Sequence, residues 1–360
     1  MTRATANAAV NAAAKAAANA AFVPALPSTK GCPMTASRDR RQFLGSAALA
    51  AGAAALTSAN RALAQRPPAP DLAAQPAPSP QSTPQRPLRI GVSTYSYWHF
   101  RGDKPDLLEL IDRSASYGFD GVEILHQMMP TEDNAFCQQL KHRAFVNGIS
   151  LMGFSIHQGF VTPDEAERQH NIDHTLKCIE LAHEMGIPTL RLNTGRWRTI
   201  KSFDEFMANK GIEPALPGYT EDQAFEWTIR AIEKLLPLAE KRGLCMGLEN
   251  HWGLGRTAAG VLRIHDAIKS PWLKITLDTG NFLEDMYPQM QAMAPHAVLV
   301  QAKTYFGGGE WYTLDIDYSR VNTILRDAGF KGWVSLEFEG KDPPEKGVPE
   351  SLKLFRKSFA

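Results

Sequence analysis

The chain from residue 88 onward repeats one pattern, which is a short apolar or β-branched run, a polar junction and then a segment with the apolar period of a helix. Such alternation is typical of an α/β protein with a parallel sheet. Eight runs are expected to be strands: 89–95, 120–125, 150–156, 189–193, 244–249, 274–278, 297–303 and 332–338. The expected helices are 107–117, 132–147, 163–185, 221–242, 258–269, 283–293, 319–328 and 350–355.

Several of the expected helices end at a glycine, as in SYGFDG and KRGLC, where a left-handed residue caps a helix and reverses the chain. Eight strand–helix units in about 270 residues fit a closed barrel. An open doubly wound sheet would need a glycine-rich turn after its first strand, but STYSYWHF follows it here. The sequence therefore predicts a single-domain (β/α)₈ TIM barrel over residues 88–360.

The first 64 residues are rich in alanine and contain one acidic residue, Asp39. Within them, RRQFL (40–44) precedes a run of small apolar residues and the small-x-small sequence ALA (62–64). This pattern looks like a twin-arginine signal peptide, so we expect residues 1–64 to be a leader and the mature protein to be periplasmic or secreted. The apolar run is too short to span a bilayer, so no stable membrane span is expected in the mature protein.

Residues 65–87 are rich in Pro, Gln, Ala and Ser, which predicts a disordered linker. Both Met1 and Met34 are open as the start of the protein, and the oligomeric state is not indicated. Seven of the 39 Lys and Arg residues and one of the 38 Asp and Glu residues lie in the leader. The rest of the chain therefore has 32 basic and 37 acidic residues. A mildly acidic domain without a basic run argues against a nucleic-acid partner.

Three cysteines follow the leader and linker, namely Cys137, Cys178 and Cys245, and none belongs to a C-x-x-C pattern. An exported protein allows a disulfide between Cys137 and Cys178, but both lie in expected helices. We expect isolated thiols in the core.

Polar residues stand at the carboxyl ends of most expected strands, where the active sites of such barrels lie. They are Glu123, His157, Arg191, Asn193, Glu249, Asp278, Gln301, Lys303 and Glu337. The carboxylates of Glu249, Asp278 and Glu337 would converge at one mouth, and their mutual repulsion needs a cation. The successive intervals between Glu249, Asp278, Gln301 and Glu337 are 29, 23 and 36 residues, and each is about one strand–helix unit. Four successive strands would therefore each contribute an oxygen to a divalent-metal site. Asn250 and His251 would line the adjoining pocket.

Five short motifs together resemble the xylose isomerase-like barrels known as sugar phosphate isomerases/epimerases. In chain order they are GVEI (121–124), GLENHWG (247–253), LDTGNF (277–282), VQAK (300–303) and SLEFEG (335–340). The resemblance extends over nearly all of the chain from residue 89. It implies that Glu249, Asp278 and Glu337 bind the metal, and that Glu249 and Glu337 also act as acid/base groups on either side of the substrate carbon.

The family usually has a histidine ligand on the seventh strand, in an H-x-K motif, whereas this chain has Gln301, Ala302 and Lys303. A glutamine offers a carbonyl oxygen, so the ligand set becomes all oxygen. Such a set favours Mn²⁺, Mg²⁺ or Ca²⁺ over Zn²⁺.

The resemblance implies a metal-dependent sugar isomerase or epimerase, which removes a proton next to a carbonyl through a metal-stabilised enediolate. Export favours free or keto-sugars over sugar phosphates, although FGGGE (306–310) is a weak phosphate-binding candidate. The long loop 195–219 contains aromatic residues suited to closing over a sugar ring. The expected substrate-binding residues are Glu123, His157, Arg191, Asn193, His251 and Lys303.

Two alternative functions stay open. Loss of a β-hydroxyl group from the same intermediate would make the protein a metal-dependent sugar lyase or dehydratase. A non-catalytic sugar-binding barrel is the other, and it is motivated by Gln301 in place of histidine. A related endonuclease is disfavoured, because it needs more histidines, including one at the position of Asn281.

Overall fold

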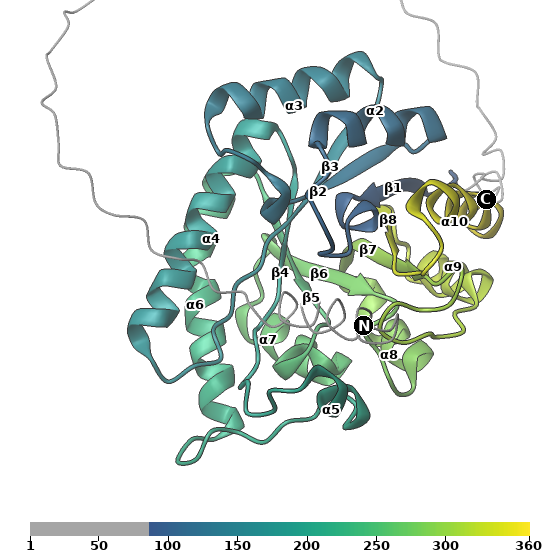
Figure 1. Cartoon of the computed structure of the whole chain (residues 1–360). Coiled ribbons are helices and arrows are strands. Elements are labelled where there is room, and N and C mark those ends of the chain that lie inside the picture. Colours follow the sequence, from purple (N-terminus) through teal and green to yellow (C-terminus); the bar gives the residue numbers. More distant parts are fainter. Residues whose placement is uncertain (1–85) are drawn as a thin grey trace, which may run out of the picture. The chain divides into compact units, whose positions relative to one another are not determined.

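The structure is a computed structural model that describes residues 86–360. The expected leader, and the expected linker up to residue 85, lie outside the described residues. Eight parallel strands, β1 to β8, form a closed barrel in which each strand pairs with its neighbours in chain order (Figure 1). The strands are β1 Arg89–Ser93, β2 Gly121–Leu125, β3 Ser150–Ser155, β4 Thr189–Leu192, β5 Cys245–Glu249, β6 Leu273–Asp278, β7 Ala297–Thr304 and β8 Trp333–Phe338. The predicted single-domain (β/α)₈ TIM barrel is confirmed.

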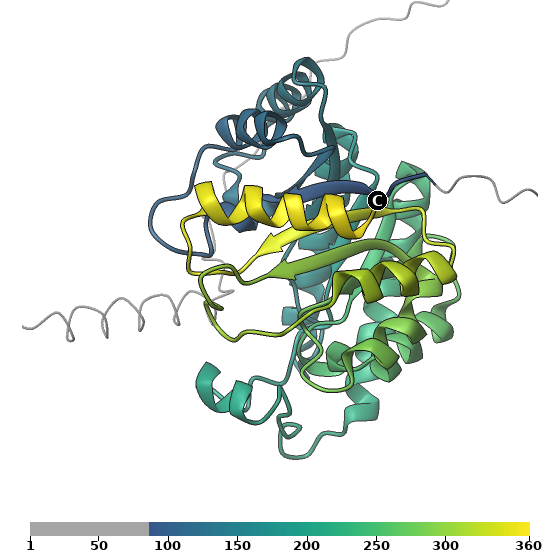
Figure 2. The ribbon, with the colours of Figure 1, turned by 90° about the vertical axis from the view of Figure 1, so that its right-hand side faces the viewer.

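Helices connect the strands and surround the barrel; α10, for example, lies across β8 (Figure 2). They are α2 Leu107–Tyr117, α3 Asn134–Val146, α4 Glu165–Met185, α5 Phe203–Ala208, α6 Glu221–Arg242, α7 Ala258–Ile268, α8 Met286–Met293, α9 Tyr318–Asp327 and α10 Pro344–Ser358. Short 3₁₀ turns are η1 Thr94–Tyr97, η2 His126–Met128, η3 Gly253–Arg256 and η4 Ala294–His296. Gly118, Gly186 and Gly243 end α2, α4 and α6 in the left-handed conformation, as their motifs predicted. No helix in residues 86–360 is both long and apolar enough to cross a membrane.

The last helix and the long loop differ from the prediction. α10 begins at Pro344, six residues before the expected start, and continues through Pro349. A proline inside a helix removes one backbone hydrogen bond, but Val348 and Phe355 on either side of it are fully buried in the core. α5 forms within the expected loop 195–219, where the Ser202 side chain caps it.

The register of the barrel brings several expected site residues side by side. Asp278 on β6 is opposite Gln301 on β7, and Lys303 on β7 is opposite Glu337 on β8. Because all strands run in one direction, their carboxyl ends share one mouth of the barrel. The hydrophobic core fills the layer between strands and helices, while the buried Asp, Glu, Lys and Arg side chains come from the strands or from residues just beyond their carboxyl ends.

Candidate active site

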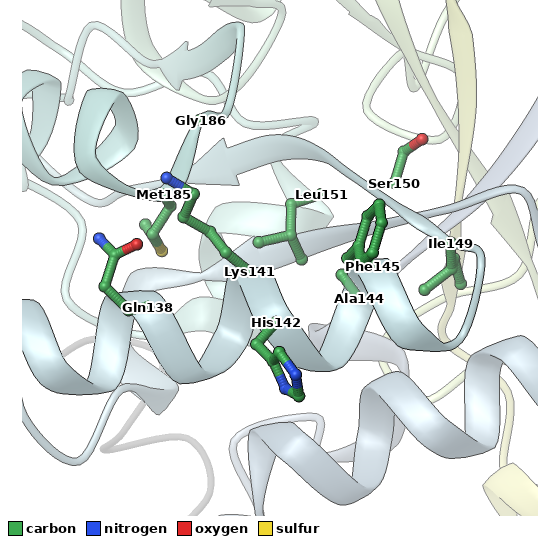
Figure 3. A pocket seen from close by; sticks show the side chains of 10 residues that line it. All are labelled: Gln138, Lys141, His142, Ala144, Phe145, Ile149, Ser150, Leu151, Met185 and Gly186. Atoms are coloured by element: carbon green, nitrogen blue, oxygen red, sulfur yellow. The ribbon is translucent and has the colours of Figure 1, made fainter.

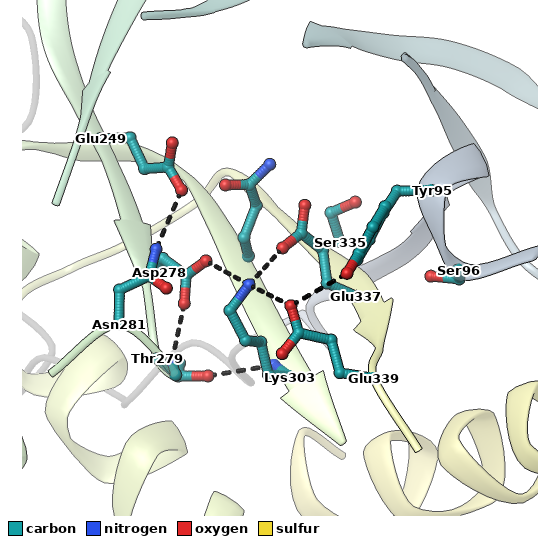
Figure 4. A network of polar contacts seen from close by, with 12 residues as sticks. Tyr95, Ser96, Glu249, Asp278, Thr279, Asn281, Lys303, Ser335, Glu337 and Glu339 are labelled. Atoms are coloured by element: carbon teal, nitrogen blue, oxygen red, sulfur yellow. Dashed lines mark hydrogen bonds and ion pairs between the residues drawn. The ribbon is translucent and has the colours of Figure 1, made fainter. Parts of the chain in front are cut away.

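The ammonium group of Lys303 lies among three buried carboxylates at the carboxyl ends of β6 and β8 (Figure 4). Its Nζ atom is 2.7 Å from Glu337 Oε2, 3.0 Å from Glu339 Oε1 and 3.0 Å from Asp278 Oδ2. Burial alone would lower the pKa of Lys303, but the carboxylates raise it well above its ordinary value. Lys303 therefore stays charged and neutralises part of the negative charge at this mouth.

Glu249, at the end of β5, contacts a different cation. Its Oε2 atom is 3.1 Å from Nε of Arg191, and its Oε1 atom accepts a hydrogen bond of 3.1 Å from Asn281 Nδ2. Arg191 also donates to the carbonyl of Ile156 at 2.6 Å. The mouth thus has two groups of opposite charges, which are Lys303 with three carboxylates and Arg191 with Glu249.

Asn250 has a structural role that differs from the expected pocket lining. Its side-chain Nδ2 donates to the Asp278 carbonyl at 2.8 Å, and its Oδ1 accepts from the Asp278 backbone amide at 2.7 Å. These two bonds join the end of β5 to the end of β6. They set the positions of Glu249 and Asp278 relative to each other.

Glu123, on β2, is completely buried and accepts hydrogen bonds from three side chains. The donors are Ser155 Oγ, Ser335 Oγ at 2.6 Å and Gln301 Nε2 at 2.8 Å. Gln301 therefore directs its NH₂ group to Glu123, and its Oε1 atom has no hydrogen-bond donor. The substrate-binding role of Glu123 stays a prediction.

The two histidines expected at the site, His157 and His251, are half-buried and uncharged at neutral pH. Burial lowers the pKa of His157 to about 3, and burial also lowers the pKa of His251 well below its ordinary value. Nδ1 of His157 is buried without a hydrogen-bond partner. Asn193 is buried, and its amide fits between Nη1 of Arg191 and the carbonyl of Gln158.

The mouth contains more buried acids than buried bases. The buried acidic residues among residues 86–360 are Glu123, Glu249, Asp278, Glu337 and Glu339, and the buried Arg and Lys are Arg191 and Lys303. Burial raises the pKa values of four of these carboxyls, namely Glu123, Glu249, Asp278 and Glu339. In other words, without a further cation these groups resist ionisation, which is the expected response to excess buried negative charge.

The donor set fits a cation that prefers oxygen ligands. Gln301 Oε1 is buried without a partner, while Glu249 Oε2 and Asp278 Oδ2 accept no hydrogen bond and each contact one base, Arg191 at 3.1 Å and Lys303 at 3.0 Å. Among residues 86–360, however, the oxygens of Glu249, Asp278 and Glu337 do not all lie within 4.8 Å of one another. A shared ion would draw these carboxylates inward, and the ligand roles stay a prediction.

Two loops flank the mouth. In loop 195–219, Glu213 pairs with Arg196 and accepts bonds from the Arg198 and Thr199 amides, so the segment is an internally bonded insertion. Phe206 in α5 is buried against Trp252. In the FGGGE segment, the amides of residues 308–310 donate to other protein groups, so they are not free to bind a phosphate.

Sequence reasoning missed Glu339 and the contact that Asn281 makes with Glu249. Glu339 lies one residue beyond the end of β8, outside the strand ends that the prediction covers. The signal was present in SLEFEG, since residues two apart on an extended segment point to the same side, as Glu337 and Glu339 do toward Lys303. Asn281 follows the strand in a loop, and no periodicity predicts its direction.

A surface groove of about 590 Å³ lies near the opposite end of the barrel, beside the start of β3 (Figure 3). Ser150 and Leu151 begin that strand and line the groove together with α3 residues such as Lys141 and Phe145. None of the buried carboxylates lines it. This groove is therefore separate from the carboxylates at the mouth.

The xylose isomerase-like TIM barrel family matches residues 111–358, so the chain belongs to this family. Solved structures with the same fold include D-psicose 3-epimerase with D-tagatose from Clostridium cellulolyticum H10, at 16% identity and a TM-score of 0.59, covering 76% of this chain and 99% of that one. Another is 3-keto-D-glucoside 4-epimerase from E. coli, at 16% identity and a TM-score of 0.61, covering 75% and 99%. A search of curated proteins finds no match. These structural neighbours are sugar epimerases, and the likeness shows the fold.

Replacing Lys303 with methionine tests the charge balance at the mouth. We expect Lys303→Met to lower the free energy of unfolding by about 3–5 kcal/mol in chelator-containing buffer, because three buried carboxylates lose their cation. Urea unfolding measures the change. Lys353→Met is the control, since Lys353 is exposed and pairs only with Glu350 on α10; it should leave stability unchanged. Equal effects of the two substitutions would contradict the proposed role of Lys303.

Proposed function

We propose that this protein is a divalent-metal-dependent sugar isomerase or epimerase that acts next to the carbonyl of a free or keto-sugar. The observation that carries the proposal is the pair of buried glutamates, Glu249 and Glu337, at one mouth of a barrel whose structural neighbours are sugar epimerases. Glu249 contacts Arg191, and Glu337 contacts Lys303, so a different base holds each glutamate.

Proton transfer is assigned to these two carboxyl groups. Burial raises the pKa of Glu249, with the nearby charge of Asp278 adding to the effect, so this group holds a proton more readily than an ordinary glutamate. Lys303 orients Glu337 through its 2.7 Å contact. In an epimerisation one group removes the proton from one face of the substrate carbon and the other returns a proton to the opposite face. Return to the neighbouring carbon would give an isomerisation.

The proposed metal site consists of Glu249, Asp278, Gln301 and Glu337. A divalent cation there would stabilise the negative charge that develops on a substrate oxygen as the neighbouring C–H bond breaks. The unpartnered buried oxygen of Gln301 supports this assignment, as does the excess of buried acids at the mouth. The all-oxygen ligand set favours Mn²⁺, Mg²⁺ or Ca²⁺. His157, Asn193 and His251 are proposed to contact substrate hydroxyl groups.

Hydrogen exchange with solvent tests the proposed reaction. Incubated in heavy water with Mn²⁺ and a series of keto-sugars that includes D-fructose, D-tagatose and a 3-keto-glucoside, the protein should place deuterium next to the carbonyl of its substrate. Glu249→Gln and Glu337→Gln should each reduce the exchange at least about 100-fold, because each removes an acid/base group. Glu240→Gln, on an exposed position of α6, is the matched control and should exchange like the unmodified protein. NMR of the recovered sugar measures the deuterium.

The same experiment separates the alternatives. Absence of deuterium uptake in every sugar would overturn the proposal and favour the non-catalytic barrel. Loss of water from the sugar would favour the lyase or dehydratase.

Metal binding is tested without turnover. Calorimetric titration of chelator-stripped protein should show Mn²⁺ binding, and Asp278→Asn and Gln301→Leu should each weaken it at least about 10-fold, since each removes an oxygen ligand. Asp327→Asn, at an exposed position of α9, should leave the affinity unchanged. An unchanged affinity for Asp278→Asn would rule out the proposed ligand set.

Export of the protein also stays a proposal, which rests on RRQFL at 40–44 in the expected leader. In a host with a twin-arginine transport system, the full chain should appear in the periplasmic or secreted fraction. A chain with Arg40→Lys and Arg41→Lys should stay in the cytoplasm. Cytoplasmic retention of the unmodified chain would contradict export.

A further inference from the structure

A second group of metal-ligating side chains lies outside the carboxylate site, where α4 packs beside the turn that follows β2. His126 belongs to η2, directly after β2, while His174 and Cys178 are one helical turn apart on α4. His170, His174 and Cys178 recur at intervals of four residues and so share one face of the helix. Among residues 86–360, His126, His174 and Cys178 are the one set of three His, Cys, Asp or Glu ligands whose atoms lie within 4.8 Å of one another.

The distances in this cluster match those between ligands of one tetrahedral ion. Cys178 Sγ is 4.0 Å from His126 Nδ1 and 3.7 Å from His174 Nε2. With Zn–S and Zn–N bonds of about 2.3 and 2.05 Å, a tetrahedral zinc ion separates its sulfur and nitrogen ligands by about 3.6 Å. The three side chains therefore need to move only slightly to enclose an ion.

A carboxylate orients His126 so that the correct nitrogen faces the cluster. Nε2 of His126 is 2.6 Å from Glu132 Oε1, while the other Glu132 oxygen pairs with Lys177. This leaves Nδ1 of His126 for a ligand on the side of Cys178. Zinc-ligating histidines are typically held in this way, by a carboxylate on the nitrogen that does not bind the metal.

We infer that His126, His174 and Cys178 form a binding site for Zn²⁺, with Glu132 as the positioning residue for His126. Two nitrogens and one sulfur suit a borderline-soft ion, in contrast to the oxygen ligands of the carboxylate site. On binding, the Cys178 thiol loses its proton to solvent and the thiolate coordinates the metal. Water occupies the fourth position. The ion joins α4 to the turn after β2, the strand that carries Glu123.

The two histidines of the cluster are half-buried. Burial lowers the pKa of His174 to about 4, and burial also lowers the pKa of His126, so both rings are uncharged at neutral pH. An uncharged imidazole is the form that binds a metal. Cys178 is fully buried, while His174 is half-buried and so the more accessible of the two α4 ligands.

Cobalt titration tests the site, because Co²⁺ replaces Zn²⁺ and a thiolate ligand gives it a charge-transfer absorption in the near ultraviolet that oxygen ligands do not give. As Co²⁺ is added to the reduced, metal-free full chain, this absorption should increase until one equivalent is bound. Added Zn²⁺ should then abolish it. Cys178→Ser and His174→Ala should lose it. Cys245→Ser removes another free thiol, on β5, and should retain it. Glu132→Gln should weaken Co²⁺ binding about 10-fold.

Each result decides the inference independently of the proposed catalytic function. Absence of the absorption in the unmodified protein, or its survival in Cys178→Ser, would overturn it. If Cys178→Ser does not fold, His174→Ala takes its place, because His174 is half-buried whereas Cys178 is fully buried, which makes it the milder substitution. Retention of full Co²⁺ affinity and absorption in His174→Ala would equally overturn the site. The carboxylate site cannot produce the signal, since it contains no sulfur.

Discussion

The contact between the Lys303 ammonium group and the carboxylates of Asp278, Glu337 and Glu339 is the interaction on which the mouth of the barrel depends. Taking carboxylates out of water costs several kcal/mol each unless a cation is close. Lys303 provides that cation because the register of β6, β7 and β8 brings the three strand ends together around it. Arg191 does the same for Glu249. The barrel thus supports a concentration of negative charge that an open surface would disperse.

The fold was predictable from the sequence because the apolar periods that distinguish strands from helices are local features of the sequence. The alternation of apolar runs predicted all eight strands in order, and the glycines predicted where several helices end. Two helices differ from the prediction. α10 continues through Pro349, where burial of the helix in the core outweighs the missing backbone hydrogen bond, and α5 is a short helix within the expected loop 195–219.

The candidate site was predictable as a set of positions but not as a set of bonds. Strand order and direction bring Asp278, Lys303 and Glu337 to one mouth, and this follows from topology. Strand periodicity does not specify side-chain rotamers. The rotamers decide whether Lys303 turns inward and whether Gln301 directs its NH₂ group or its oxygen to Glu123. Gln301 illustrates the point, since its NH₂ group completes a buried network and its oxygen stays available for another partner.

The paired hydrogen bonds of Asn250 have a mechanical consequence. They resemble the bonds of a strand pair continued by a side chain, and they couple β5 to β6 at the point where Glu249 and Asp278 emerge. The two strand ends cannot slide past each other without breaking both of these buried bonds. The backbones beneath Glu249 and Asp278 are therefore tied together, and the side-chain torsions are the freedom left to each carboxylate.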